Sequence, residues 1–453
     1  MINTLKRIFL IAGDVGILYF SLATALLIRY GSRFSPETWN RHFIPFTILY
    51  AIWIGVLWSQ NLYEPRVIGN RREFFRSLAG SLAINAALGV GFFYFIPYFA
   101  ITPKTILFLN LLFFSIFFSV WRYGYNFLTG SSRLRKHLVF IGINKEVGEL
   151  IHELSENPQL GYRPMAVYTE TEGPIPRQLI HLKTRGGLNT YLGQQEIHTI
   201  CFSQDEDARN LHLYSYIPRG TEFKRVPQLY EEITGRIPLD LIQELWFLEN
   251  LNRGYVAGYN MLKRGFDMIF ASFLLIVILP FWPFIILSIK LGDGGPIFLK
   301  QTRVGENGRP LQVLKFRTMI PEAEKHGPLW SRENDPRITR VGRVLRSTLL
   351  DETPQLLLVL AGKMSLVGPR PERKEFVENL ARQIPHYTIR HMVKPGLTGW
   401  AQINFGYGSS VEDAIQKLQY ELYYIKNRSL ALDLSILFKT VNIIMERALW
   451  KKR

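Results

Sequence analysis

An acidic pair, Asp351-Glu352, lies in a part of the chain that is rich in groups able to bind phosphate. Arg346 precedes the pair by five residues, and the loop Gly368-Pro369-Arg370-Pro371 follows it. Adjacent carboxylates at the start of a helix can simply cap its free amides and interact with the positive end of its dipole. Neighbouring arginines, however, favour the charged form, so we expect Asp351 to be ionised at neutral pH. Such an anion could attack a phosphorus atom as a nucleophile.

The basic residues of the last third are distributed among glycines and polar residues. Residues 258–453 contain 29 Lys plus Arg and 17 Asp plus Glu, a difference of +12 out of the net charge of +17. The spaced arginines are Arg317, Arg332, Arg337, Arg340, Arg343 and Arg346. This spacing favours a diphosphate pocket over a nucleic-acid tract, because planar guanidinium groups bind phosphate oxygens in pairs. A solvated face against anionic lipid is the alternative.

An apolar run from Phe266 to Ile289 precedes this basic region and must help to position it. The run is long enough to cross a bilayer, but Pro280 and Pro283 lie near its middle. Proline removes a backbone donor and breaks or kinks a helix. We expect helix 262–290 to bend at Leu279-Pro280 and return, because the basic region that follows is difficult to translocate. A kinked helix that spans the membrane is the alternative.

Residues 1–130 have the pattern of a four-helix transmembrane domain. Each apolar run is near the about 20 residues that cross about 30 Å of hydrocarbon. The four runs are Ile8–Ile28, Phe43–Leu62, Leu78–Tyr98 and Ile106–Trp121. Basic flanks such as Lys6, Arg71 and Arg122 are predicted to face the cytoplasm, although Arg29 and Arg33 lie in a loop assigned to the other side.

Residues 131–255 are predicted to form a cytoplasmic, Rossmann-like α/β domain. His137–Gly142 has the pattern of a buried strand, and Asn144–Leu154 that of the helix after it. A dinucleotide loop needs G-x-G-x-x-G, but Asn144 and Val147 occupy the second and third glycine positions. We therefore expect a structural or regulatory module, with a bound nucleotide as the alternative.

Composition agrees with a chain that has both membrane and soluble parts. Its 453 residues correspond to about three domains, and 47% of them are hydrophobic, between a soluble enzyme and a polytopic transporter. The single cysteine, Cys201, excludes an intrachain disulfide framework.

Several ordered motifs in residues 258–453 resemble the bacterial sugar transferase family, the monotopic polyprenyl-phosphate hexose-1-phosphate transferases. They are Lys263-Arg-Gly-Phe-Asp267, Gln301-Thr-Arg303-Val-Gly305, Lys315-Phe-Arg-Thr-Met319, Asp335-Pro-Arg337, Asp351-Glu-Thr-Pro-Gln355, Ser365-Leu-Val-Gly-Pro-Arg-Pro371 and Lys394-Pro-Gly-Leu-Thr-Gly-Trp400. The whole chain resembles the long-form members. The implied fold is a membrane α-helical bundle, a Rossmann-like domain, and a mainly α-helical, membrane-inserted catalytic domain, 256–453, with a re-entrant helix hairpin.

The resemblance also implies roles for individual residues. Asp351 would be the nucleophile, and Glu352 its partner near Mg²⁺ and the lipid phosphate, with both carboxylates as metal ligands. Phosphate-binding side chains would be Arg346, Lys315, Arg317, Arg337 and Arg370. Pro280 matches the family's helix-breaking proline, although Leu279 replaces the serine that often precedes it.

The implied reaction moves a hexose-1-phosphate from a UDP-sugar to undecaprenyl phosphate and releases UMP, as the first membrane step of exopolysaccharide or O-antigen biosynthesis. The implied location is the bacterial cytoplasmic (inner) membrane, with the catalytic domain on the cytoplasmic face, in contact with lipid and without nucleic acid. Long-form members look dimeric, so a homodimer is implied too. A membrane scaffold or flippase component without transferase activity is the alternative, although the four apolar runs hold only isolated polar residues such as Asp14 and Asn85. The sequence does not indicate which sugar is used.

Overall fold

The computed structural model describes residues 2–60, 62–63, 71–95, 104–129, 135–170, 179–203, 211, 213–251, 257–321, 323, 335–406, 408 and 410–449. The chain forms two compact units, Met1–Leu229 and Tyr230–Arg453. The second unit begins earlier than the boundary expected near residue 255. Ile237, Phe247 and Leu251 explain this difference, because they pack into the same hydrophobic core as Leu418 and Leu422.

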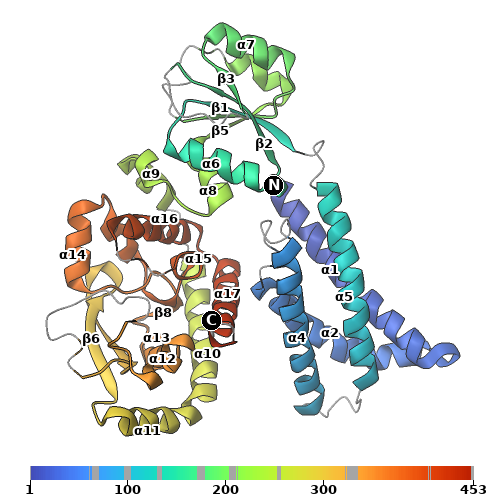
Figure 1. The fold of residues 1–453 in the computed structure, drawn as a ribbon, viewed down its shortest axis with the longest axis vertical. Coiled ribbons are helices and arrows are strands. Elements are labelled where there is room, and N and C mark those ends of the chain that lie inside the picture. The colour runs from blue at the N-terminus through green and yellow to red at the C-terminus, as the bar shows by residue number, and fades with distance from the viewer. Residues whose placement is uncertain are drawn as a thin grey trace. The chain divides into compact units, whose positions relative to one another are not determined.

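Four long helices account for the apolar runs of the first unit, and their labels are those of Figure 1. They are α1 (Ile2–Tyr30), α2 (Pro36–Ser59), α4 (Arg71–Phe95) and α5 (Lys104–Thr129). Helix α1 packs against α5, and α4 packs against both α2 and α5. Their shared core includes Leu22, Phe46, Trp53 and Phe114. The end of the third predicted run, 96–98, lies outside the described residues.

A buried ion pair connects α1 with α5. Arg122 Nη2 lies 2.6 Å from Asp14 Oδ2, and the Trp121 indole N–H donates a hydrogen bond of 3.1 Å to Asp14 Oδ1. Buried charges in helical bundles need a partner of this kind. Asp14, one of the isolated polar residues in the four runs, is therefore paired inside the protein.

A parallel five-stranded sheet forms the rest of the first unit. The strands are β1 (Lys136–Ile141), β2 (Tyr162–Tyr168), β3 (Ile180–Leu182), β4 (Thr199–Phe202) and β5 (Glu222–Arg225), and the helices between them include α6 (Lys145–Glu156) and α7 (Arg185–Gln194). The strand order β3-β2-β1-β4-β5 is that of the doubly wound, Rossmann-like folds. Asn144 caps α6 by accepting a hydrogen bond from the Val147 amide, so the turn after β1 is closed by a side chain.

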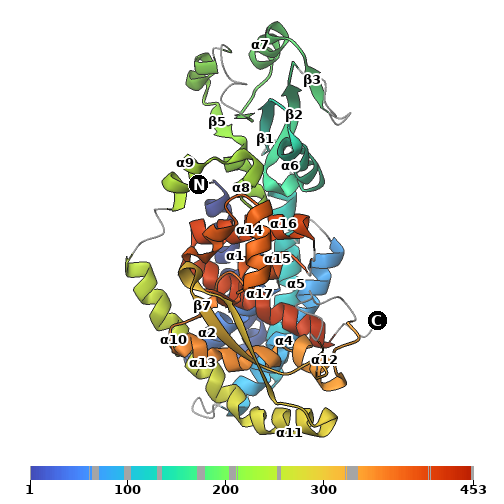
Figure 2. The ribbon, with the colours of Figure 1, turned by 90° about the vertical axis from the view of Figure 1, so that its left-hand side faces the viewer.

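The long apolar helix of the second unit is interrupted where the prolines predict it. Helix α10 (Ala257–Ile278) ends in a short 3₁₀ turn, Leu279–Phe281, and α11 (Trp282–Asp293) leaves in a new direction (Figures 1 and 2). Large apolar side chains on both helices, such as Ile276 and Phe284, are exposed. Among the described residues, this segment and the four helices of the first unit are long and apolar enough to cross a membrane. Re-entry of the bent helix stays a prediction.

The remainder of the second unit combines helices with two small sheets. An antiparallel hairpin joins β6 (Phe298–Val304) to β7 (Pro310–Phe316), and a parallel pair joins β8 (Ser365–Val367) to β9 (Gly396–Thr398). The helices are α8 (Val226–Thr234), which crosses the boundary between the units, α9 (Glu244–Leu251), α12 (Arg340–Ser347), α13 (Leu356–Leu360), α14 (Lys374–Gln383), α15 (Trp400–Asn404), α16 (Val411–Asn427) and α17 (Leu430–Leu449).

Candidate active site

The acidic pair lies in a buried 3₁₀ helix, Leu350–Gln355, that leads into α13. The residue before this helix, Leu349, has a left-handed backbone with φ 55°, and no side chain caps the helix. Asp351 Oδ1 is buried and has no hydrogen-bond partner. Helix capping therefore does not explain Asp351, because the carboxylate accepts no hydrogen bond from the helix amides.

The β6–β7 hairpin directs positive charge toward the acidic pair. Its antiparallel register sets Arg303 opposite Leu311, Gln301 opposite Val313, and Leu299 opposite Lys315. Opposed residues share a face of a sheet, so Arg303 and Lys315 lie on the same side as the buried Leu311 and Val313. The 3₁₀ helix that carries Asp351 packs against β7. Lys315 and Arg303 thus come from one face of one hairpin.

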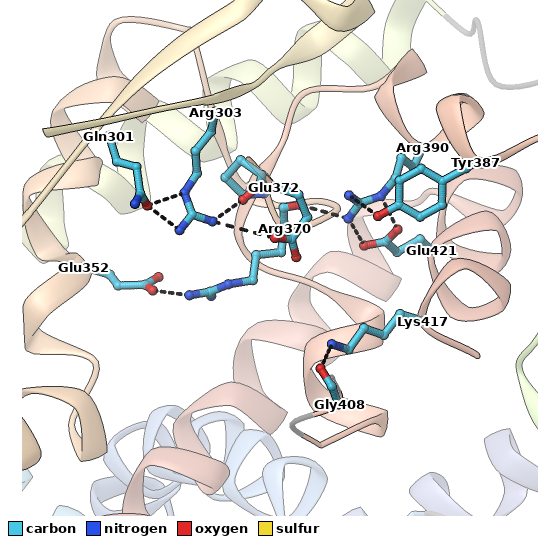
Figure 3. A network of polar contacts seen from close by, with 11 residues as sticks. Gln301, Arg303, Glu352, Arg370, Glu372, Tyr387, Arg390, Gly408, Lys417 and Glu421 are labelled. Carbon is cyan, nitrogen blue, oxygen red and sulfur yellow. Dashed lines mark hydrogen bonds and ion pairs between the residues drawn. The ribbon is translucent and has the colours of Figure 1, made fainter. Parts of the chain in front are cut away.

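Arg370 supplies a third cation from the loop after β8. Its Nη2 donates a hydrogen bond of 2.5 Å to Glu352 Oε1, and Figure 3 shows the two side chains extended toward each other. A charge-assisted contact of this length is among the stronger polar interactions in a protein. It joins two motifs that are 18 residues apart in the sequence.

The two carboxyl groups of the pair have different proton affinities. Burial raises the pKa of Asp351, and the neighbouring Glu352 raises it further, to about 7, against the opposing effect of Lys315, Arg346 and Arg370. Burial also disfavours the Glu352 anion, but Arg370 and Lys315 outweigh it, and the pKa of Glu352 is lowered. The expectation that Asp351 is ionised at neutral pH is therefore wrong in part, because two carboxylates in one buried site do not both ionise easily.

Lys315 also titrates closer to neutrality than an ordinary lysine. Burial is the main cause, and with the nearby charge of Arg303 it lowers the pKa of Lys315 to about 8, in opposition to Glu352 and Asp351. The site consequently holds an acid and a base whose charges both change near physiological pH.

The other arginines named from the sequence occupy different surroundings. Arg346 Nε donates to Thr318 Oγ1 at 2.9 Å, and the charge of Arg346 acts on Asp351. Gly342 allows helix α12, which carries Arg346, to lie close to Thr318, because a Cβ at position 342 would lie 2.0 Å from the Thr318 carbonyl oxygen.

Two of the named arginines bind acceptors on the protein itself. Arg317 is buried and donates to the carbonyl oxygens of Pro296 and Met319, whereas Arg337 pairs with Asp335 through contacts of 2.6 and 2.9 Å. Phosphate binding by Arg317 and Arg337 stays a prediction. Arg332 lies outside the described residues.

A small cleft opens beside the acidic pair. It is lined by Arg303, Val313, Lys315, Glu352, Gln355, Arg370, Pro371 and Gly396. Three cations and one anion in so small a space suit a ligand that carries several negative charges. Sequence reasoning assigned no role to Arg303, although the short hairpin turn at Gly305 and Gly308 would have set it on the face of Lys315.

The acidic pair is chemically suited to hold Mg²⁺. Magnesium is commonly bound by one or two carboxylates together with substrate phosphates and water. The unpartnered Oδ1 of Asp351 and the adjacent Glu352 provide such a set. Among the residues that the structure describes, no group of three or more His, Cys, Asp or Glu side chains could hold a metal ion. A complete coordination shell would therefore need ligands from substrate or solvent.

Polar side chains on α10 fix the apolar helix to the site. Lys263 Nζ lies 2.8 Å from Asp433 Oδ2 on α17, and Tyr259 donates to the same oxygen at 3.1 Å. Asp267 Oδ1 accepts a hydrogen bond from the Leu366 amide in β8. Arg264 donates two bonds of 2.6 Å to the Val359 and Leu360 carbonyls, at the end of α13. Helix α10 is thus attached to α13, β8 and α17, which all follow the acidic pair in the chain.

Comparison with known proteins matches the part of the chain that contains this site. The model of the family described as bacterial sugar transferase covers residues 258–447. A UDP-N-acetylgalactosamine-undecaprenyl-phosphate N-acetylgalactosaminephosphotransferase of Aeromonas hydrophila is 40% identical over 220 residues, which are 49% of this chain and 51% of that protein. A UDP-glucose:undecaprenyl-phosphate glucose-1-phosphate transferase of Escherichia coli (strain K12) is 42% identical over 189 residues, 41% of each chain.

A shorter relative is covered almost completely. The exopolysaccharide production protein PSS of Rhizobium leguminosarum bv. phaseoli is 41% identical over 190 residues, which are 40% of this chain and 94% of that protein. The chain belongs to the bacterial sugar transferase family. It spans about half the length of the Aeromonas protein and 41% of the Escherichia protein.

Proposed function

We propose that this chain transfers a hexose-1-phosphate from a UDP-sugar to undecaprenyl phosphate and releases UMP. The observation that carries the proposal is the buried Asp351-Glu352 pair beside a cleft lined by Arg303, Lys315 and Arg370. A nucleophile and several cations in one small cleft suit phosphoryl transfer, in which positioning and charge stabilisation supply most of the catalysis. The names of the relatives support the same reaction class.

The first step forms a covalent bond to Asp351. In its ionised form, a carboxylate oxygen of Asp351 attacks the phosphorus that carries the sugar, and the bond from this phosphorus to the bridging oxygen of UMP breaks. UMP leaves with that oxygen, and the sugar phosphate stays on Asp351. Arg370 and Lys315 bind phosphate oxygens, so that two anions can approach each other.

The second step returns the carboxylate to its starting state. An oxygen of undecaprenyl phosphate attacks the same phosphorus, and the bond between Asp351 and phosphorus breaks. The product is undecaprenyl diphosphate bearing the sugar. Mg²⁺ held by Asp351 and Glu352 would offset charge on the phosphates when bound. Two displacements allow UMP to depart before the lipid phosphate arrives.

We also propose where the reaction takes place. The lipid phosphate cannot leave the membrane surface, whereas the UDP-sugar is dissolved in the cytoplasm. A bent α10–α11 hairpin that returns to the cytoplasmic face of the inner membrane would bring the acidic pair to the headgroups. The exposed apolar side chains of α10 and α11, such as Phe273 and Leu287, support this location.

Radiolabel transfer tests the reaction. Full-length protein is incubated with undecaprenyl phosphate and each member of a panel of UDP-sugars labelled in the sugar. We expect label in the organic extract and equal release of UMP for at least one sugar, and neither with Asp351→Asn. Folded protein that transfers no label from any member would favour the scaffold or flippase alternative. Near-normal transfer by Asp351→Asn would remove Asp351 from the role of nucleophile.

Cysteine labelling tests the position of the hairpin. Cys201 is the chain's only cysteine, so a Cys201→Ser background accepts single reporters. Met261→Cys and Leu291→Cys both replace highly exposed side chains, one near each end of the hairpin. An impermeant thiol reagent should reach both from the cytoplasmic side of membrane vesicles. Reaction from opposite sides would show a spanning helix and contradict the proposed location.

A further inference from the structure

Arg370 lies in the segment Pro369–Glu372, and the backbone carbonyl of each residue in this segment accepts a hydrogen bond. The Pro369 carbonyl accepts from the Gly396 amide at 2.9 Å, and the Glu372 carbonyl accepts from the Val304 amide at 2.8 Å. Between them, the Arg370 carbonyl accepts from Arg390 Nη2 at 2.9 Å, and the Pro371 carbonyl accepts from Arg303 Nη1 at 2.5 Å. Two of these four donors are arginine side chains.

The sequence of this segment restricts its backbone further. Pro369 and Pro371 fix their own φ angles near −65° and lack an N–H group, so neither can donate to a competing acceptor. Gly396 permits the close approach of the neighbouring strand, since a Cβ there would lie 2.1 Å from the Gly368 nitrogen. The position of the Arg370 side chain is therefore set by a backbone with little freedom.

Arg390 and Glu352 lie on opposite sides of Arg370 (Figure 3). Its Nε and Nη2 donate to the two carboxylate oxygens of Glu421 on α16 at 2.7 and 2.6 Å, and Nη1 donates to the Tyr387 hydroxyl at 3.3 Å. Arg390 is 3% exposed and Glu421 5% exposed. A fully buried charge pair is expensive to desolvate, so stability alone is a weak explanation for its presence.

The planar guanidinium group can bind Glu421 and the Arg370 carbonyl at the same time. Its donors point in fixed directions, whereas a lysine ammonium group is a single point of charge on a flexible stem. Glu421 orients the Arg390 guanidinium and neutralises its charge. The Arg390–Arg370 hydrogen bond thus connects a structural ion pair on one side of the segment with Glu352 on the other.

We propose that Arg390, oriented by Glu421, is a positioning residue that holds Arg370 against Glu352. By holding the Arg370 backbone, it fixes the position from which the Arg370 guanidinium group reaches the Glu352 carboxylate. This role rests on the proposed transferase function, but the contacts that carry it do not depend on the identity of the sugar or the lipid.

The substitution Arg390→Lys keeps a positive charge beside Glu421. It removes the guanidinium N–H group that donates to the Arg370 carbonyl. In full-length protein in detergent, we expect turnover to fall by about 100-fold, the scale of a misplaced catalytic group. The unfolding midpoint should stay close to that of the unsubstituted protein. Unchanged turnover would overturn the proposal.

A double-variant cycle separates positioning from general stabilisation. Arg370→Met removes the side chain that Arg390 is proposed to act through. If the proposal is correct, Arg390→Lys costs nothing more in the Arg370→Met background, because effects of residues that act as a unit are not additive. Losses that multiply in the double variant would show that Arg390 acts independently of Arg370 and would overturn the proposal.

Hydrogen–deuterium exchange gives a readout that needs no turnover. Peptides covering residues 365–373 should exchange faster in Arg390→Lys than in the unsubstituted protein, and unchanged exchange there would overturn the proposal. Lys417→Gln is the matched control, because Lys417 lies on the same helix as Glu421 and, like Arg390, donates to a backbone carbonyl, that of Gly408, at 3.2 Å. It should alter neither exchange at 365–373 nor turnover. If the unsubstituted protein transfers no sugar, the proposed function fails, but the exchange result still decides the role of Arg390.

Discussion

Asp351 and Glu352 are adjacent in the chain, but their carboxyl groups are displaced in opposite directions from ordinary acidity. Arg370 lies 2.5 Å from Glu352 and lowers its pKa, whereas burial and the Glu352 charge raise the pKa of Asp351 to about 7. The pKa of Glu352 is thus lowered, whereas that of Asp351 is raised toward neutrality. The proposed nucleophile is therefore the group of the pair whose charge changes near neutrality.

Turnover should depend on pH through Asp351. Only the ionised carboxylate can attack phosphorus, so the rate should fall as pH decreases through about 7. UMP release at limiting UDP-sugar across the neutral range measures this acid limb for the free enzyme. A limb centred near the ordinary aspartate pKa of about 4 would contradict the raised proton affinity.

Lys315 should set the alkaline limb of the same profile. Its positive charge is lost as pH rises through about 8, and one phosphate contact is lost with it. Lys315→Arg should retain activity at pH values where the unsubstituted protein loses it, because a guanidinium group stays protonated. The Lys315→Met variant should have a low turnover rate at every pH. An alkaline limb that Lys315→Arg leaves in place would assign it to another group.

Asp351→Asn should increase stability at alkaline pH while it abolishes transfer. The pKa of Asp351 is raised in the folded state, so the stabilisation of its neutral form is complete below about 4 and is lost as pH rises through about 7. Asparagine remains neutral at every pH. The unfolding midpoint of the variant should therefore exceed that of the unsubstituted protein at pH 8, and the two should converge in acid. A lower midpoint for the variant at pH 8 would contradict the expected sign.

Asp433→Ala should destabilise the second unit. Lys263 would keep its charge in a largely buried position without its partner, and breaking such a pair costs about 3–5 kcal/mol. Chemical denaturation of detergent-solubilised protein measures the free energy of unfolding. Glu378→Gln is the control, because the exposed Lys374–Glu378 pair on α14 should contribute almost nothing. Equal losses for both variants would rule out a special role for the Asp433 contacts.

Local patterns in the sequence predict much of the fold. The four apolar runs become α1, α2, α4 and α5, and the strand expected at His137–Gly142 becomes β1, Lys136–Ile141. The break at Leu279–Phe281 lies at the expected proline. These features depend on hydrophobic periodicity and on the missing amide of proline, which are properties of short stretches of chain.

The electrostatics of the site could not be predicted in the same way. The surroundings of Asp351 depend on how deeply it is buried and on its distance from Lys315, which belongs to a hairpin 36 residues earlier. The Arg390–Glu421 pair likewise joins residues that are 31 positions apart. No periodic pattern records such contacts, because they arise only when distant elements pack together.

Helix α10 carries Tyr259, Lys263 and Asp267 at intervals of four residues, a polar stripe along one face of an otherwise apolar helix. The stripe, together with Arg264, contacts α17, β8 and the end of α13. An unrelated membrane anchor in place of this helix would insert into the bilayer equally well. It would leave Asp433 and the Leu366 amide without their hydrogen-bond partners on α10. Chimeras of this protein therefore need to exchange the helix and the domain together.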